Sequence, residues 1–212
     1  MTGPAQPVHP VRHVLLDADG VLQRVPRGWV GLVEPWLGAD ARGFLEGFWA
    51  EEGPALSGHG DFVGLLGDHL DRAGIDTDPR EVFEAVWLAI EVDATSIALV
   101  GELRAAGLGV HLGTNQERHR AAHMRAVLGY DDLFDVSCYS CDLGAAKPDP
   151  EYFLRALDAV GDDPRSVLFV DDRQDNVEAA RSVGLPAEQW ELDQGHDALC
   201  GLLAGHGVLV RT

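Results

Sequence analysis

Residues 13–22 read His-Val-Leu-Leu-Asp-Ala-Asp-Gly-Val-Leu, a short aliphatic run that ends in two aspartates and a glycine. The run over residues 14–16 is continuously apolar, which is typical of a parallel β-strand covered on both faces. Residues 110–112 and 167–170 form two later runs of similar character. Helical patterns lie between these runs, and strands that alternate with helices predict an α/β protein with a doubly wound parallel sheet.

Each of the three runs ends in polar residues, namely Asp17, Thr114 and Asp171. In doubly wound sheets, ligands bind in the crevice outside the carboxyl ends of the strands. We therefore expect residues that are far apart in the sequence to meet at one edge of the sheet.

Three helices can be predicted in the second half of the chain from their end signals. Asn115 is expected to cap a helix that stops near Gly129, and Asp149 with Pro150 to begin a helix that continues through Leu157. A third helix is predicted over residues 175–184, because it ends at a glycine with a proline close behind.

Residues 23–95 depart from the strand–helix alternation, because their apolar residues recur at helical spacing. We predict a helical cap over residues 23–95, an α/β core formed by residues 11–22 and 96–212, and a flexible tail over residues 1–10. Such an insertion over the crevice would act as a lid. Four of the five tryptophans fall in the cap and are expected to form its core rather than to stack on a substrate: Trp29, Trp36, Trp49 and Trp87.

The composition restricts the classes of partner. The 212 residues carry 35 acidic and 16 Lys or Arg side chains, for a formal net charge of −19. Such a field repels nucleic acid and anionic membranes, so we expect neither as a partner. No apolar run approaches the ~20 residues of a membrane span. The proline-containing N-terminus has no apolar signal core, so we expect a flexible tail there and not an export signal. Three cysteines cannot form an even disulfide framework, which favours a reducing cytoplasm. Either a monomer or a dimer is compatible with the sequence.

Asp17 and Asp19 follow the first strand at positions i and i+2. Two such residues can share a divalent cation, one through its side chain and the other through its backbone carbonyl, and Mg²⁺ prefers oxygen ligands. Taken alone, the pattern is weak, because turns favour aspartate.

Two further motifs carry groups that suit a phosphate. Thr114 and Asn115 follow the second strand, where a hydroxyl and backbone N–H groups at a helix start can hold a phosphate oxygen. Thr114 and Glu117 also have the spacing of a capping box, which is the simpler explanation of this motif alone. Lys147 lies between small residues and prolines, and a fixed ammonium can neutralise charge that develops on a phosphoryl group.

Asp171 and Asp172 directly follow the third strand. Adjacent carboxylates after a buried strand disfavour each other's ionisation, and a bound cation is the natural way to keep both charged.

The four motifs together, in this order and context, resemble those of the haloacid dehalogenase superfamily across roughly residues 13–188. This resemblance implies a Rossmann-like core and a Mg²⁺-dependent phosphatase that hydrolyses a small phosphorylated metabolite. The stretches 141–147 and 170–176 are similar to those of the small-capped sugar-phosphate phosphatases of the superfamily.

The resemblance also implies roles for individual residues. Asp17 would be the nucleophile that forms a phospho-aspartyl intermediate, and Asp19 the general acid and then base. The phosphoryl group would be held by Thr114, Asn115 and Lys147. The Mg²⁺ site would consist of Asp17, Asp19 and Asp172, with Asp171 and Asp175 in support; Asp172 is favoured over Asp171 as the direct ligand.

The rest of the substrate would then contact cap residues, for which the candidates are Arg24, Arg27, Trp29 and His59. Three alternatives stay open: a phosphomutase, a catalytically idle binding module of the same fold, and a dehalogenase. Residues 23–27 lack the Asp-Thr or Asp-Ser pair of many phosphomutases. Dehalogenases carry a non-acidic residue at the position of Asp19 and need no metal.

Other pairs of potential ligands receive structural interpretations. Cys138 and Cys141 have the spacing of a zinc or redox pair, but no second pair completes a tetrahedral site, so buried thiols are expected. His119 and His123 are expected on a solvated helix face, and His111 in the core.

Overall fold

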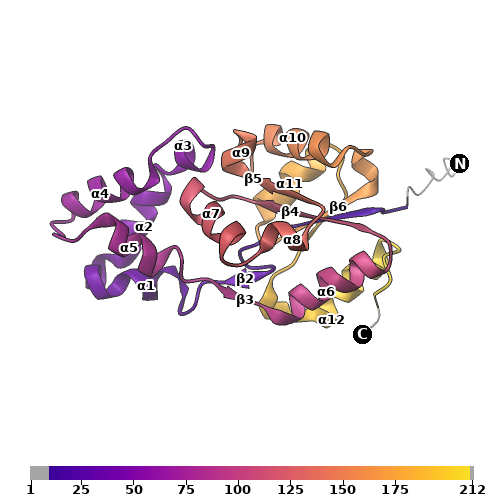
Figure 1. Cartoon of the computed structure of the whole chain (residues 1–212), viewed down its shortest axis with the longest axis horizontal. Helices are drawn as coiled ribbons and strands as arrows, with labels where there is room; N and C mark the ends of the chain where they lie inside the picture. Colours follow the sequence, from indigo (N-terminus) through magenta and orange to yellow (C-terminus); the bar gives the residue numbers. More distant parts are fainter. Residues whose placement is uncertain (1–9, 211–212) are drawn as a thin grey trace, which may run out of the picture.

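The computed structural model describes residues 10–210. A parallel sheet with the strand order β5-β4-β1-β6-β7 forms its centre, which confirms the predicted doubly wound sheet (Figure 1). Its strands are β1 (His13–Leu16), β4 (Gly109–Thr114), β5 (Val136–Tyr139), β6 (Val167–Asp171) and β7 (Ala187–Gln189). β5 and β7 were not predicted, because they are short edge strands that carry polar residues among their apolar ones.

Helices cover both faces of the sheet, with α10 and α11 on one face and α6 and α12 on the other (Figure 1). Side chains alternate along each strand, so Leu16 packs in the apolar cluster of α6 and α12, and Leu15 in that of α10 and α11. The helices of this core are α6 (Ala94–Ala105), α7 (Arg118–Ala126), α8 (Tyr130–Leu133), α9 (Ser140–Leu143), α10 (Pro150–Val160), α11 (Gln174–Ser182) and α12 (His196–Gly205). Short 3₁₀ turns lie at Gly38–Asp40, Pro164–Ser166 and Leu192–Gln194. No helix in residues 10–210 combines the length and the apolar character that a membrane crossing requires.

Helices α1 to α5 lie beyond the carboxyl ends of the strands (Figure 1). They are α1 (Gly28–Leu37), α2 (Ala41–Trp49), α3 (Gly53–Leu56), α4 (Phe62–Arg72) and α5 (Pro79–Val86). An antiparallel pair, β2 (Gln23–Arg24) and β3 (Glu91–Val92), forms the stem that joins them to the core. These helices share an apolar cluster of their own, in which Phe48 contacts Phe62 edge to face with 4.9 Å between ring centroids. Their action as a movable cap stays a prediction.

The tryptophans of this region do not all have the expected place. Trp87 is buried in the cluster at 3% exposure and Trp36 packs against it. Trp49, in contrast, is 39% exposed. The expectation of a common core position is therefore wrong for Trp49.

The helix starts also differ in one detail from the sequence prediction. Asp149 caps α10 through the Glu151 backbone N–H, as predicted. The cap of α7, however, is Glu117, whose carboxylate accepts from the first backbone N–H groups of that helix. Asn115 does not cap it, because β4 continues through Thr114 and the Asn115 side chain is engaged elsewhere.

Candidate active site

Asp17 follows β1 directly, and its side chain contacts the ammonium group of Lys147. The Lys147 Nζ atom lies 2.9 Å from Asp17 Oδ1 and 2.6 Å from Asp171 Oδ2, and it donates to the Gly113 carbonyl at 2.8 Å. The Ala18 backbone N–H also donates to Asp17 Oδ1, at 2.7 Å. Burial alone would lower the pKa of Lys147, but Asp17 and Asp171 outweigh it and raise the pKa, so the ammonium stays charged.

The two adjacent aspartates at the end of β6 have different surroundings. Asp171 is fully buried, and its Oδ1 accepts from the Arg173 backbone N–H (2.8 Å) and from Asn176 Nδ2 (2.9 Å). Asp172 is half-buried, and within residues 10–210 its carboxylate accepts no hydrogen bond. It lies against Gly20, where a Cβ atom would come within 2.7 Å of Asp172 Oδ2. Asp171 therefore orients Lys147, while the oxygens of Asp172 are free for a ligand.

Asp17, Asp171 and Asp172 form a group with the donor set of a divalent-cation site. One carboxylate oxygen from each lies within 4.8 Å of the others. Burial, together with the charges of its two partners, raises the pKa of Asp17 well above its usual range despite Lys147. Burial and then Asp171 raise the pKa of Asp172 to about 6. Three carboxylates thus share one ammonium group. A cation that prefers oxygen ligands, such as Mg²⁺, could bind to them and balance the remaining negative charge.

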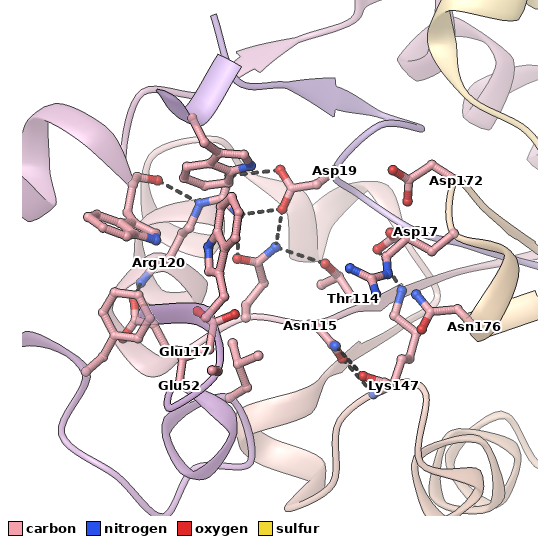
Figure 2. Close-up of a pocket in the computed structure, with 18 of the residues that line it drawn as sticks. Asp17, Asp19, Glu52, Thr114, Asn115, Glu117, Arg120, Lys147, Asp172 and Asn176 are labelled. Atoms are coloured by element: carbon pink, nitrogen blue, oxygen red, sulfur yellow. Dashed lines mark hydrogen bonds and ion pairs between the residues drawn. The ribbon is translucent and has the colours of Figure 1, made fainter. Parts of the chain in front are cut away.

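Thr114 and Asn115 lie beside this group at the end of β4. Thr114 is buried, and its Oγ1 accepts a hydrogen bond from Gln116 Nε2 at 2.9 Å. Asn115 and Lys147 make a reciprocal pair: Asn115 Nδ2 donates to the Lys147 carbonyl (2.8 Å), and the Lys147 backbone N–H donates to Asn115 Oδ1 (2.9 Å). The amide of Asn115 therefore holds the loop that presents the lysine. All three residues line one cavity of about 670 Å³ together with Asp17, Asp19 and Asp172 (Figure 2).

Asp19 lines the same cavity but faces a different set of partners. Arg120 forms a two-pronged ion pair with it, at 2.5 Å to Oδ2 and 2.8 Å to Oδ1. Gln23 Nε2 donates to Oδ1 (2.9 Å) and Gln116 Nε2 to Oδ2 (3.0 Å). Burial would raise the pKa of Asp19, but Arg120 and the two amides outweigh it and lower the pKa to about 2. The carboxylate lies outside the three-carboxylate group, so a metal contact through its backbone carbonyl stays a prediction.

Arg120 is the main site residue that the sequence reasoning missed. It is buried, it donates through Nε to the Trp87 carbonyl at 2.6 Å, and its guanidinium lies 5.4 Å from the centre of the Trp29 ring. In the sequence it is one of several basic residues of α7 and looks like part of a solvated face. Its position three residues after Glu117, on the helix that follows the Thr114 motif, was the available signal.

The predicted cap residues separate into two groups. Trp29 lines the cavity, but Arg24, Arg27 and His59 are not among the described residues that do. Gln23 points inward to Asp19, and Arg24, the next residue along β2, points the other way and pairs with Asp193 at 3.6 Å. Arg27 is exposed at the start of α1. The structure therefore does not bring these two arginines to the cavity.

The remaining candidates have structural positions. Asp175 pairs with Arg173 at 2.7 Å and lies outside the three-carboxylate group. Asn176, which the sequence reasoning missed, donates to Asp171 Oδ1, and the supporting role of Asp175 stays a prediction. Cys138 and Cys141 are buried free thiols, and burial raises their pKa values to about 12 and 11.

The histidines match their structural interpretations only in part, because His123 is not fully solvated and the buried Nδ1 of His111 has no hydrogen-bond partner among the described residues. His111 is buried in β4, where burial lowers its pKa to about 4, so the ring is neutral. His119 is exposed on α7 and His123 is half-buried.

Two similar proteins are phosphatases. The chain is 33% identical over 120 residues to the sesquiterpene phosphatase astK of Aspergillus oryzae, a match that covers 57% of this chain and 60% of that protein. It is 26% identical over 198 residues to a phosphoglycolate phosphatase of Yersinia pestis, a match that covers 83% and 79%. The chain thus spans less than two thirds of the length of the first of these relatives.

A haloacid dehalogenase family enzyme of Bacteroides thetaiotaomicron, solved with magnesium and inorganic phosphate, has a similar fold. Its TM-score is 0.73 at 18% identity, over 89% of this chain and 98% of that chain. The sequence pattern of one hydrolase family, described as haloacid dehalogenase-like hydrolase, matches residues 11–184. By this match, which covers most of the sequence, the chain belongs to the haloacid dehalogenase-like hydrolases.

Proposed function

We propose that this hydrolase is a Mg²⁺-dependent phosphatase that cleaves a small phosphorylated metabolite, such as a sugar phosphate, through a phospho-aspartyl intermediate on Asp17. The observation that carries the proposal is the shared cavity of Asp17, Thr114, Lys147 and Asp172, which come from three strand ends and one loop. The phosphatase names of the relatives and the magnesium and phosphate of the Bacteroides enzyme support it.

The surroundings of Asp17 favour one of its oxygens as the nucleophile. Oδ1 is held by Lys147 and by the Ala18 N–H, whereas Oδ2 accepts no hydrogen bond within residues 10–210. In the first step Asp17 Oδ2 attacks phosphorus, and the bond from phosphorus to the ester oxygen breaks. Lys147 and Thr114 hold the phosphoryl group while its charge is redistributed.

Asp19 is the proton carrier in this proposal. It gives its proton to the leaving oxygen in the first step, and it takes a proton from the water that attacks phospho-Asp17 in the second. The second step regenerates Asp17 and releases phosphate. In the structure Arg120 holds Asp19 ionised, which is the form of the base, so Asp19 must part from Arg120 to gain the proton for the first step.

A Mg²⁺ ion bound by Asp17 and Asp172 would screen the repulsion between the phosphate and the attacking carboxylate. Asp171, which already holds Lys147 at 2.6 Å, would support the site without being its first ligand. A cytoplasmic location stays a prediction, supported by the free thiols.

Asp17→Asn tests the proposal, because an amide of the same size cannot attack phosphorus. We expect phosphate release from para-nitrophenyl phosphate to fall by several orders of magnitude and the acid-quenched protein to carry no phosphoryl group. Asp193→Asn, the same change at a side chain that is 84% exposed, is the matched control. Turnover by Asp17→Asn within tenfold of the wild type would refute the role of Asp17. Return of the phosphate to the substrate, rather than to water, would identify a phosphomutase.

A further inference from the structure

The cavity is larger than a phosphate group requires. Its volume of about 670 Å³ is in the ordinary range for a site that encloses a whole small molecule. In Figure 2, Asp17, Asp172 and Lys147 lie on one side of the cavity, while Glu52 and Glu117 lie on the side of Arg120. If the phosphoryl group occupies the first side, the leaving group of the ester faces the second.

Aromatic side chains from the helices beyond the sheet line this second part. Trp29 from α1, Trp49 from α2, Phe62 from α4 and Trp87 after α5 all line the cavity. Trp49 is 39% exposed and does not belong to the buried apolar cluster of these helices. The faces of such rings attract organic cations as well as apolar groups.

Two carboxylates whose side chains form no ion pair within residues 10–210 line the cavity together with these rings. Glu46 and Glu52 line the cavity, and within residues 10–210 neither makes a hydrogen bond or an ion pair through its side chain. Glu117 is buried and close enough to Glu52 for its charge to act on it, and its oxygens accept from backbone N–H groups of α7. Burial raises the pKa of Glu52 to about 7. The charges of Arg120 and Arg173 oppose this rise, and the charge of Glu117 adds to it.

The cations that line the cavity are already paired. Arg120 binds Asp19 through two hydrogen bonds, Lys147 binds Asp17, and Arg173 binds Asp175 at 2.7 Å. The ionised form of Glu52 therefore has no cation of its own in this part of the cavity, although the charges of Arg120 and Arg173, which are paired elsewhere, also act on it. A hydroxyl group could donate to Glu52, but it would leave that charge uncompensated.

We propose that this enzyme selects phosphate esters whose leaving group carries a protonated amine, which Glu52 and the aromatic side chains of the cap helices recognise. This inference rests on the proposed phosphatase function and adds the chemical class of the substrate. The ammonium would replace the missing partner of Glu52 and lie against the Trp29 or Trp49 ring.

The test compares two esters that differ in charge and little else: para-(aminomethyl)phenyl phosphate and para-(hydroxymethyl)phenyl phosphate. The ratio of their kcat/KM values is measured with Mg²⁺ near neutral pH, with phenyl phosphate as the reference. We expect the wild type to prefer the amine by roughly tenfold or more, the size of one well-placed charged contact. Glu52→Gln keeps the shape and removes the charge, so the ratio should fall close to one.

Glu34→Gln is the matched control, because Glu34 is an exposed carboxylate of α1 outside the cavity. It should keep both the basal rate and the wild-type ratio. Equal rates for the two esters in the wild type, or a ratio unchanged in Glu52→Gln, would overturn the inference while leaving the phosphatase proposal standing. A preference for the hydroxymethyl ester that Glu52→Gln abolishes would also overturn it and make Glu52 a hydroxyl acceptor. Failure to hydrolyse all three esters, with Mg²⁺ present, would refute the proposed function itself.

Discussion

Replacement of Arg120 by methionine should expose the energetic cost of an unpaired Asp19. The change keeps an apolar chain of similar length but removes both ion-pair hydrogen bonds to Asp19, at 2.5 and 2.8 Å. Removing one partner of a fully buried ion pair lowers the free energy of unfolding by ~3–5 kcal/mol, because water cannot hydrate the charge that remains. The side chain of Asp19 is 32% exposed and keeps two amide donors, so we expect a loss of about 2–3 kcal/mol.

The pH dependence of this loss identifies its cause. The pKa of Asp19 is lowered from 3.8 to about 2 in the folded protein. Its contribution to stability is therefore complete above the unfolded value and disappears as the pH falls through the folded value. The difference in unfolding free energy between wild type and Arg120→Met should accordingly be largest near neutral pH and shrink below pH ~4.

Urea denaturation at several pH values gives this difference. The control is Arg72→Met, which breaks the exposed pair of Arg72 with Glu51 (3.3 Å) and should cost less than ~1 kcal/mol. An Arg120→Met loss below 1 kcal/mol at neutral pH, or one that does not change on acidification, would refute the assignment of Arg120 as the partner that keeps Asp19 ionised.

Three further predictions concern the metal, the lysine and the helical insertion. Mg²⁺ at 100 times its Kd should stabilise the fold by ~2.7 kcal/mol and raise the Tm. In scanning calorimetry with increasing Mg²⁺, Asp172→Asn should lose most of this rise in Tm, whereas Glu34→Gln should keep it. Lys147→Ala should lower kcat/KM by ~10²-fold or more for every ester, because it removes charge stabilisation in the transition state; a loss confined to one ester would contradict this. Phe48→Ala should cost ~3–5 kcal/mol of unfolding free energy against less than 1 kcal/mol for the exposed Trp49→Ala, and similar losses would mean that α1–α5 lack a packed core.

The catalytic edge could be predicted because its signals are local to each strand end. A buried apolar run followed by a polar residue indicates the end of a parallel strand, and topology brings Asp17, Thr114 and Asp171 together without knowledge of any contact. The structure adds how the two neighbours differ: Asp171 holds Lys147, whereas the carboxylate of Asp172 accepts no hydrogen bond within residues 10–210.

The rest of the site depends on packing that sequence periodicity does not encode. Arg120 belongs to a polar-looking helix and becomes buried only because Asp19 and the Trp87 carbonyl meet it from other segments. Arg24 and Arg27 have the right charge for a phosphorylated substrate, but the alternation of side chains along β2 and the exposed start of α1 direct them away.

The stem of the helical insertion, formed by the two-residue strands β2 and β3, has a thermodynamic consequence. Gln23 lies in β2, donates to Asp19 through Nε2 at 2.9 Å, and accepts from the Tyr130 hydroxyl through Oε1 at 2.6 Å. The segment on which the helices would pivot is therefore also part of the environment that sets the proton affinity of Asp19. By linkage, a ligand that displaces this stem must change the proton affinity of Asp19 by the same factor as protonation of Asp19 changes the affinity for that ligand. Substrate binding and protonation of Asp19 would then be thermodynamically coupled, so that each changes the equilibrium constant of the other.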